Sequence, residues 1–204
     1  YHRLRPNGEA VNIMEADWDT LVILDACRYD MFERLSTLPG KLESRLSEGS
    51  ATDEFVEQNF GDETFDDVVY VTANPRVNLT FGGSFHSIIN VWEESWDEDL
   101  QTVPPKKVAD ATLRALEEYP NKRIVSHFIQ PHAPFIGEFA QENLVYHSTL
   151  SGHRPNADDE TSASENVWTL LRRGEVDKET VKQAYDENLE IALPHVEQII
   201  NAEL

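Results

Sequence analysis

The fold is decided by the stretch Asp19-Thr20-Leu21-Val22-Ile23-Leu24-Asp25-Ala26-Cys27-Arg28-Tyr29-Asp30. The unbroken apolar run from Leu21 to Leu24 predicts a strand that is buried on both faces, as a central strand of a parallel sheet is. The strand ends at the carboxylate of Asp25, and a helical pattern follows at once. Ligands of open α/β sheets bind beyond the carboxyl ends of the strands, so Asp25 is a candidate functional residue. An equally weighted alternative is that Asp25 only caps the next helix.

Two further apolar runs, 68–72 and 123–129, predict strands of the same sheet as 20–25. Helical patterns alternate with these runs, for example over 28–36. This alternation predicts an α/β fold, with a mostly parallel sheet that is flanked by helices on both faces.

The domain organisation follows from the remaining patterns. The length predicts a single domain over 1–204. Residues 79–103 are expected to form an irregular insertion, and the polar stretch 151–166 a mobile loop. The longest helix is expected from Asp177 to about residue 202.

The charge of the chain limits its partners. The chain has 38 acidic against 17 basic residues and a net charge of −21. This composition favours adaptation to high salt, where screening suppresses self-repulsion; the alternative is an ordinary acidic protein. The negative charge disfavours nucleic-acid partners. The sequence shows neither a membrane-spanning run nor a signal peptide, so a high-salt cytoplasm is the expected location, although the start at Tyr1 leaves a missing N-terminal segment open.

Several polar residues lie at predicted strand ends or helix starts. Thr52 precedes an amphipathic helix, where it is either a simple cap or a nucleophile beside the positive end of the helix dipole. Asn74 and Arg76 follow the strand 68–72 and either bind an anionic substrate or form a turn. His132 lies between two prolines after the strand 123–129 and is the best ligand candidate among the histidines, whereas His127 within that strand is expected to be a core histidine.

The single cysteine, Cys27, does not complete a known catalytic motif. A Cys-x5-Arg phosphatase loop, an Asp-x-Asp pair and a sulfatase Cys-x-Pro-x-Arg motif all fail at the required positions. Cys27 is therefore expected to be a small buried apolar residue, with a reactive thiol as the minor alternative.

Taken in order, these pieces resemble the alkaline-phosphatase/sulfatase superfamily. Asp25 matches the acidic metal ligand that ends the first strand of such proteins, and Arg28-Tyr29-Asp30 is similar to the Arg-Pro-Asp that often follows. Gly49-Ser50-Ala51-Thr52 is similar to the Gly-Thr-x-Thr stretch of phosphoethanolamine transferases, whose second Thr is the nucleophile. The resemblance nominates Thr52, with Ser50 as runner-up.

The C-terminal half continues the resemblance. His132-Ala133-Pro134-Phe135 is similar to the stretch that carries the substrate-binding His of the family, and the helix with Tyr185 and Asp186 resembles its Tyr-rich helix. The resemblance implies an alkaline-phosphatase-like fold, a divalent metal (zinc, calcium, magnesium or manganese) held in part by Asp25 and Thr52, and a phosphate- or sulfate-ester substrate.

One departure divides the functional interpretations. The family has an Asp-His-Gly after the last helix, and this chain has none. Because zinc sites normally take at least three protein ligands, Asp25 and Thr52 alone would not make a tight site. The chain is then either the N-terminal portion of a metal-dependent hydrolase or transferase, whose metal position is expected to be empty or weakly filled in this portion, or a non-catalytic binding or assembly module. An unrelated salt-adapted α/β domain is the third alternative. An incomplete sheet would also expose an apolar edge that a partner chain in an oligomer could cover.

Overall fold

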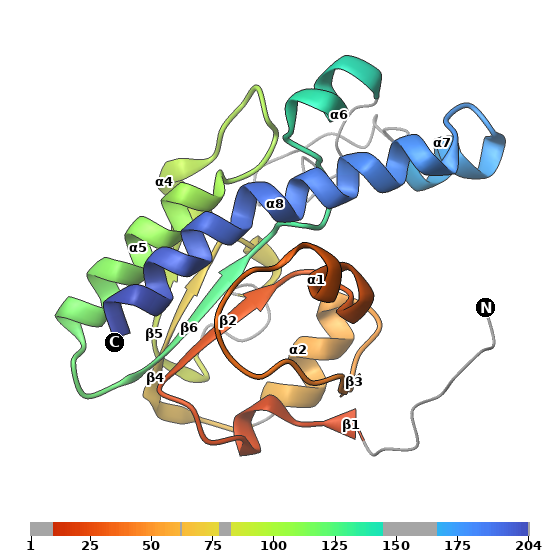
Figure 1. Cartoon of the computed structure of the whole chain (residues 1–204). Helices are drawn as coiled ribbons and strands as arrows, with labels where there is room; N and C mark the ends of the chain where they lie inside the picture. The colour runs from red at the N-terminus through yellow and green to blue at the C-terminus, as the bar shows by residue number, and fades with distance from the viewer. Residues whose placement is uncertain (1–9, 62, 78–82, 145–166, 204) are drawn as a thin grey trace.

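The computed structural model describes residues 10–61, 63–77, 83–144 and 167–203. Its centre is one sheet of four parallel strands, and their spatial order is β2 (Thr20–Leu24), β6 (Arg123–Phe128), β4 (Phe65–Thr72), β5 (Phe85–Asn90) (Figure 1). All three predicted strands belong to this sheet. The predicted α/β class with a mostly parallel sheet is confirmed.

Among the described residues β2 lies at the edge of the sheet, whereas a central strand was expected. In that part of the chain it pairs with β6 alone. Its side chains are nevertheless partly buried on both faces, since Leu21 and Ile23 pack in one core cluster and Val22 and Leu24 against another. The apolar run therefore indicates that helices cover both faces of the strand. It does not indicate how many strands lie beside it.

β5 was missed, because the segment 79–103 was expected to be irregular. Phe85 and the half-buried Ile88 and Ile89 pack against the rest of the sheet, and β5 pairs in parallel with β4. A short helix, α4 (Val91–Ser95), follows directly. Only two adjacent residues of β5 are aliphatic, so its pattern is too short to distinguish a strand from a loop.

One face of the sheet is covered by α5 (Pro105–Glu118) and α8 (Lys178–Glu203), which run side by side in Figure 1. Val69 and Val71 of β4 point into this layer, where they join apolar side chains of both helices. The apolar residues of α5 lie on one helix face, as an amphipathic helix requires.

The other face is covered by α2 (Thr52–Phe60) and the 3-10 helix η1 (Ile13–Glu15). Val68 and Tyr70 point into this layer, because successive side chains of a strand alternate between its two faces. The predicted helices on both faces are thus confirmed. Phe60 of α2 makes edge-to-face contacts with Tyr70, at 5.5 Å between ring centroids, which fixes α2 against β4.

Smaller elements complete the fold: α1 (Tyr29–Leu35), α6 (Glu138–Asn143), α7 (Val167–Arg173), and a second parallel pair, β1 (Ala10–Val11) with β3 (Leu46–Ser47). α1 packs on α8 through Met31, Leu189 and Leu193. The stretch expected to be a mobile loop, 151–166, lies outside the described residues.

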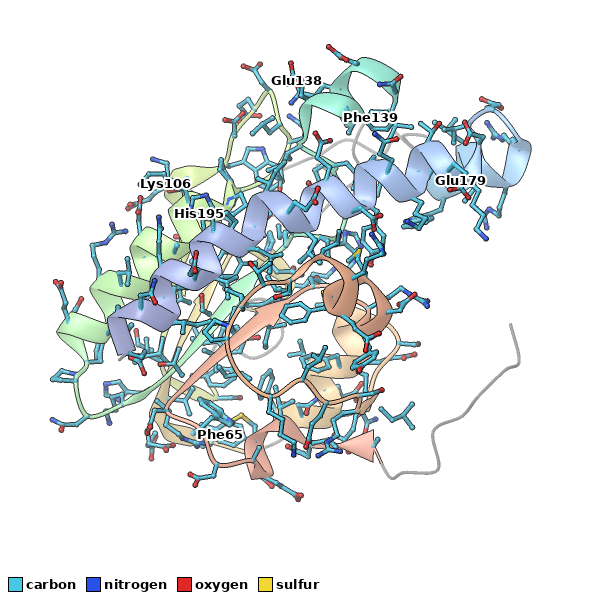
Figure 2. The ribbon with its side chains drawn as sticks, viewed as in Figure 1. Phe65, Lys106, Glu138, Phe139, Glu179 and His195 are labelled. Carbon is cyan, nitrogen blue, oxygen red and sulfur yellow. The ribbon has the colours of Figure 1, made fainter. Side chains whose placement is uncertain are left out.

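Charged side chains lie on the outside of the fold. Lys106, Glu138 and Glu179 are exposed and point away from the core (Figure 2). Within the described ranges, none of the helices combines the length and the apolar character that crossing a bilayer needs.

Candidate functional site

Asp25 lies at the carboxyl end of β2, directly after its last residue. Its backbone N–H donates to the carbonyl of Phe128 at 3.2 Å, and its carbonyl accepts from His132 N–H at 3.1 Å. The chain then turns at Ala26, whose φ of 60° lies in the left-handed region. The N-cap of α1 is Arg28 rather than Asp25, so the interpretation of Asp25 as a mere helix cap was wrong.

Polar side chains from three other elements converge on one carboxylate oxygen of Asp25. Thr52 Oγ1 and Asn74 Nδ2 each donate to Asp25 Oδ2 at 3.3 Å, and His127 Nε2 lies 3.9 Å from the same oxygen. They come from the start of α2, the turn after β4 and the body of β6. The carboxyl edge of the sheet therefore collects them, as doubly wound folds do.

Thr52 is the first residue of α2, and it does not cap the helix. The N-cap is Ala51, and no side chain caps this helix terminus. The runner-up, Ser50, is exposed and donates its hydroxyl to Glu54 Oε2 at 2.7 Å. Of the two hydroxyls nominated as nucleophile, only that of Thr52 contacts Asp25.

The loop before α2 lies against the helix backbone. A Cβ added at Gly49 would lie 2.2 Å from the backbone nitrogen of Phe55, closer than real Cβ contacts come. Gly49 therefore permits the close approach that brings the helix terminus and Thr52 to the cavity.

Asn74 forms the turn that the sequence allowed, and its side chain also contacts Asp25, whereas binding of an anionic substrate by Asn74 stays a prediction. Its Oδ1 accepts from Arg76 N–H at 3.1 Å, which forms an Asx turn, while its Nδ2 reaches Asp25. The turn is fixed further by Thr72 Oγ1, which accepts from Asn74 N–H at 2.9 Å. Arg76 lines the same cavity as Asp25.

His132 lies on the loop after β6 and also lines the cavity. Its Nδ1 lies 2.6 Å from the carbonyl oxygen of Ala133; since a carbonyl only accepts, Nδ1 carries a proton and donates to it. The loop is fixed by Asn188 of α8, which the sequence analysis did not identify. Asn188 is fully buried and donates to the carbonyls of Pro131, His132 and Pro134.

The cavity has a volume of about 790 Å³. Its lining includes every predicted site residue: Asp25, Ser50, Thr52, Asn74, Arg76 and His132. The fold thus brings Asp25, Thr52 and His132 to one cavity, whereas the chemical roles assigned to them stay predictions.

His127 is a site residue that the sequence analysis placed in the core. Both descriptions apply, since it is buried and also borders the cavity. Burial lowers the pKa of His127, and the nearby Asp25 carboxylate offsets this only in part, so the ring is neutral at pH 7. Its Nδ1 lies 3.0 Å from the hydroxyl of Tyr70. Burial raises the pKa of that hydroxyl, which therefore stays protonated and donates to Nδ1.

This tautomer leaves the proton of His127 on Nε2, the nitrogen that faces Asp25. The contact between them is a weak polar contact of a neutral ring rather than an ion pair. The contact between Tyr70 and His127 follows from the strand register. Tyr70 of β4 pairs with Val125 of β6, two residues before His127.

Cys27 is half-buried and lines the cavity, so the expectation of a buried apolar residue fits only in part. Burial, together with the charge of Asp30, raises the pKa of the Cys27 thiol to about 11. The thiol is therefore protonated at neutral pH and is a poor nucleophile.

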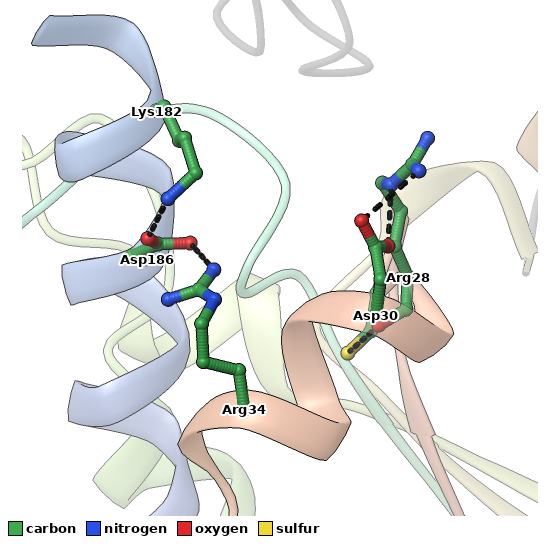
Figure 3. Close-up of polar contacts among 6 residues, drawn as sticks. Arg28, Asp30, Arg34, Lys182 and Asp186 are labelled. Carbon is green, nitrogen blue, oxygen red and sulfur yellow. Dashed lines mark hydrogen bonds and ion pairs between the residues drawn. The ribbon is translucent and has the colours of Figure 1, made fainter. Parts of the chain in front are cut away.

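The two helix residues of the resemblance have different surroundings. Tyr185 donates its hydroxyl to the carbonyl of Ala26 and so supports the turn after Asp25. Asp186 instead accepts from Arg34 of α1 at 2.7 Å and from Lys182 at 2.8 Å (Figure 3). It is not among the residues that line the cavity. Partial burial raises the pKa of Asp186, but these two cations outweigh it and hold the pKa below its usual value.

Arg28 and Asp30, the charged residues of the Arg28-Tyr29-Asp30 stretch, are exposed to solvent. They form an ion pair at 2.8 Å (Figure 3). Exposed pairs of this kind stabilise a fold only slightly. The sulfur of Cys27 lies 3.9 Å from the backbone oxygen of Arg28.

The donor set at the cavity contains two oxygen atoms of the kind that divalent cations bind. They are Asp25 Oδ2 and Thr52 Oγ1, and both belong to one cluster. Asn74 turns its amide nitrogen to Asp25, so it offers no oxygen there. Within residues 10–61, 63–77, 83–144 and 167–203, no three His, Cys, Asp or Glu side chains gather closely enough to hold a metal. Comparison with family models, curated proteins and solved structures yielded no match.

Proposed function

We propose that this chain carries the nucleophile half of an enzyme that hydrolyses or transfers phosphate or sulfate esters. The observation that carries the proposal is the pair Thr52 and Asp25. A threonine hydroxyl at an uncapped helix N-terminus donates to a carboxylate, 3.3 Å away, in a cavity of about 790 Å³.

The chemistry assigned to each group follows from its position. Thr52 Oγ attacks the phosphorus or sulfur atom and forms the covalent ester, while its proton passes to Asp25 Oδ2. The bond to the leaving oxygen breaks, and that oxygen is protonated from solvent. Water then hydrolyses the ester on Thr52, or an acceptor alcohol takes the group in a transferase.

Three further groups support this chemistry. The backbone N–H groups and dipole of α2 favour an anion beside Thr52. Arg76 borders the cavity and suits oxygen atoms of the ester. His132 also borders the cavity, and its Nε2 donates to such an oxygen when the ring carries a proton on both nitrogens. Asn74 and the neutral His127 hold the Asp25 carboxylate from two sides.

A divalent cation would be held in part by Asp25 and Thr52. It would lower the pKa of the hydroxyl and neutralise charge that develops in the transition state. Because two donors do not complete such a site, the remaining ligands must come from outside the described residues.

The test is capture of the covalent intermediate. The protein is incubated with 4-nitrophenyl phosphate or 4-nitrophenyl sulfate, with zinc or manganese, and quenched in acid for peptide mass spectrometry. We expect an adduct on Thr52 that is absent in Thr52→Ala and retained in Thr52→Ser. An adduct on Ser50 would show that Ser50, and not Thr52, is the nucleophile. Binding of the ester without any adduct would favour the binding-module alternative.

A further inference from the structure

The cavity has two kinds of wall. One is polar and contains Asp25, Thr52, Asn74 and His127. The other is apolar and comes from α2, the loop after β6 and α7: Phe55, Ile129, Ala133, Val167 and Trp168. Small-molecule sites commonly combine such an apolar lining with a few polar groups.

Trp168 is the unusual member of the apolar wall. It is 44% exposed, whereas the preceding residue Val167 is 0% exposed. Val167 packs with Phe135 and Leu144 in the cluster that joins α6, α7 and α8. Trp168 belongs to none of the four core clusters found among the described residues.

α7 therefore packs through Val167 and Leu171, and the indole of Trp168 stays open at the cavity. A large aromatic surface left in contact with water at a cavity is typical of a binding surface rather than of a core. The half-buried ring of Phe55, on the first turn of α2, borders the same cavity only three residues after Thr52. An apolar surface thus lies beside the candidate nucleophile.

We propose that the alcohol part of the substrate ester is apolar, with an aromatic ring as the form that Trp168 recognises. The ring would lie against the indole, while the charged phosphate or sulfate group would lie at Thr52. This inference rests on the proposed function for the position of the charged group. If the alcohol were a sugar or another polyhydroxy compound, its hydroxyl groups would lie against the apolar wall without hydrogen-bond partners. Such an ester would therefore bind less tightly.

The experiment compares three probes by isothermal titration calorimetry: 2-naphthyl phosphate, inorganic phosphate and 2-naphthol. Each is titrated into the wild-type protein, Trp168→Ser and Tyr29→Ser. Tyr29 is the matched control, because it is an aromatic side chain with 40% exposure that does not line the cavity. Circular dichroism checks that both variants are folded.

We expect the wild-type protein to bind 2-naphthyl phosphate about tenfold more tightly than inorganic phosphate, because the ring covers apolar surface of the indole. Trp168→Ser should reduce this preference to about twofold or less, with unchanged phosphate affinity, and Tyr29→Ser should keep it. A preference that survives in Trp168→Ser overturns the inference, and so does equal binding of the two phosphates by the wild-type protein.

The two proposals fail in different ways. If phosphate binds but the naphthyl group adds nothing, the apolar subsite is refuted and the proposed function stands. If 2-naphthol binds in a Trp168-dependent manner while inorganic phosphate does not bind, the apolar subsite stands and the anionic ester is refuted. If none of the three probes binds, both proposals are refuted.

Discussion

Replacing the buried Asn188 with aspartate tests how the fold holds the loop that carries His132. The Nδ2 of Asn188 donates to three carbonyls, those of Pro131 at 3.1 Å, His132 at 3.0 Å and Pro134 at 3.3 Å. Its Oδ1 accepts from Ile136 N–H at 2.9 Å. Asn188→Asp keeps the shape and this acceptor, and it places an oxygen where the donor was.

The expected loss of stability can be worked from these contacts. An amide nitrogen has two hydrogens, so the change removes two hydrogen bonds, about 1 kcal/mol each. It also leaves at least one buried carbonyl unpartnered, for about 1–3 kcal/mol more. We therefore expect the free energy of unfolding to fall by about 3–5 kcal/mol near pH 8. The loss should shrink as the pH falls, because burial among carbonyls raises the pKa of the new carboxyl, which can donate once it is protonated.

The assay is urea unfolding at constant high salt, at several pH values. Asn143→Asp is the matched control, since Asn143 is exposed and donates one hydrogen bond, to Phe139 O at 2.9 Å. If Asn188→Asp unfolds within about 1 kcal/mol of this control near pH 8, Asn188 does not fix the loop in the way described.

Three further outcomes are expected. Because burial lowers the pKa of His127 in the folded state, the unfolded chain takes up this proton first as the pH falls. Urea unfolding below about pH 6.5 should therefore show the wild-type protein losing up to about 1.4 kcal/mol per pH unit relative to His127→Gln, and parallel curves would contradict the buried neutral ring. Gly49→Ala should lower the melting temperature well below that of Gly83→Ala, because its new carbon meets Phe55 N at 2.2 Å whereas that of Gly83 meets nothing within 4 Å; equal calorimetric midpoints would refute the tight loop. At a net charge of −21, transfer from molar to dilute salt should lower the melting temperature as the Debye length grows from about 3 Å to about 30 Å, and an unchanged midpoint would show that the acidity is incidental.

The strands could be predicted because their apolar runs are local. β2, β4 and β6 were found in this way, and β5 was missed because its aliphatic pattern is short. Strand order could not be predicted. The apolar side chains on both faces of β2 are explained by the helices that cover those faces, so they do not show which strands lie beside β2. Which strand pairs with β2 depends on contacts about a hundred residues away, which no local pattern encodes.

The site was predictable where a residue stands at the end of an element. Asp25, Thr52 and His132 satisfy this condition, and all three line one cavity. His127 lies inside a strand, so its part in the site depends on register and on Tyr70 in the neighbouring strand. Asn188 was missed for a similar reason, since its partners lie more than 50 residues away in the chain.

The strand order also constrains how the chain can fold as it is synthesised. β2 emerges first among the four strands of the main sheet, yet its described partner is β6, which begins at Arg123. β4 and β5 are close in sequence and can pair early, whereas β2 must wait until β6 is available. Asp25 and Thr52 are both made long before that moment, so the polar cluster between them can form only when β6 inserts between β2 and β4. The last step of sheet assembly is then also the step that builds the site.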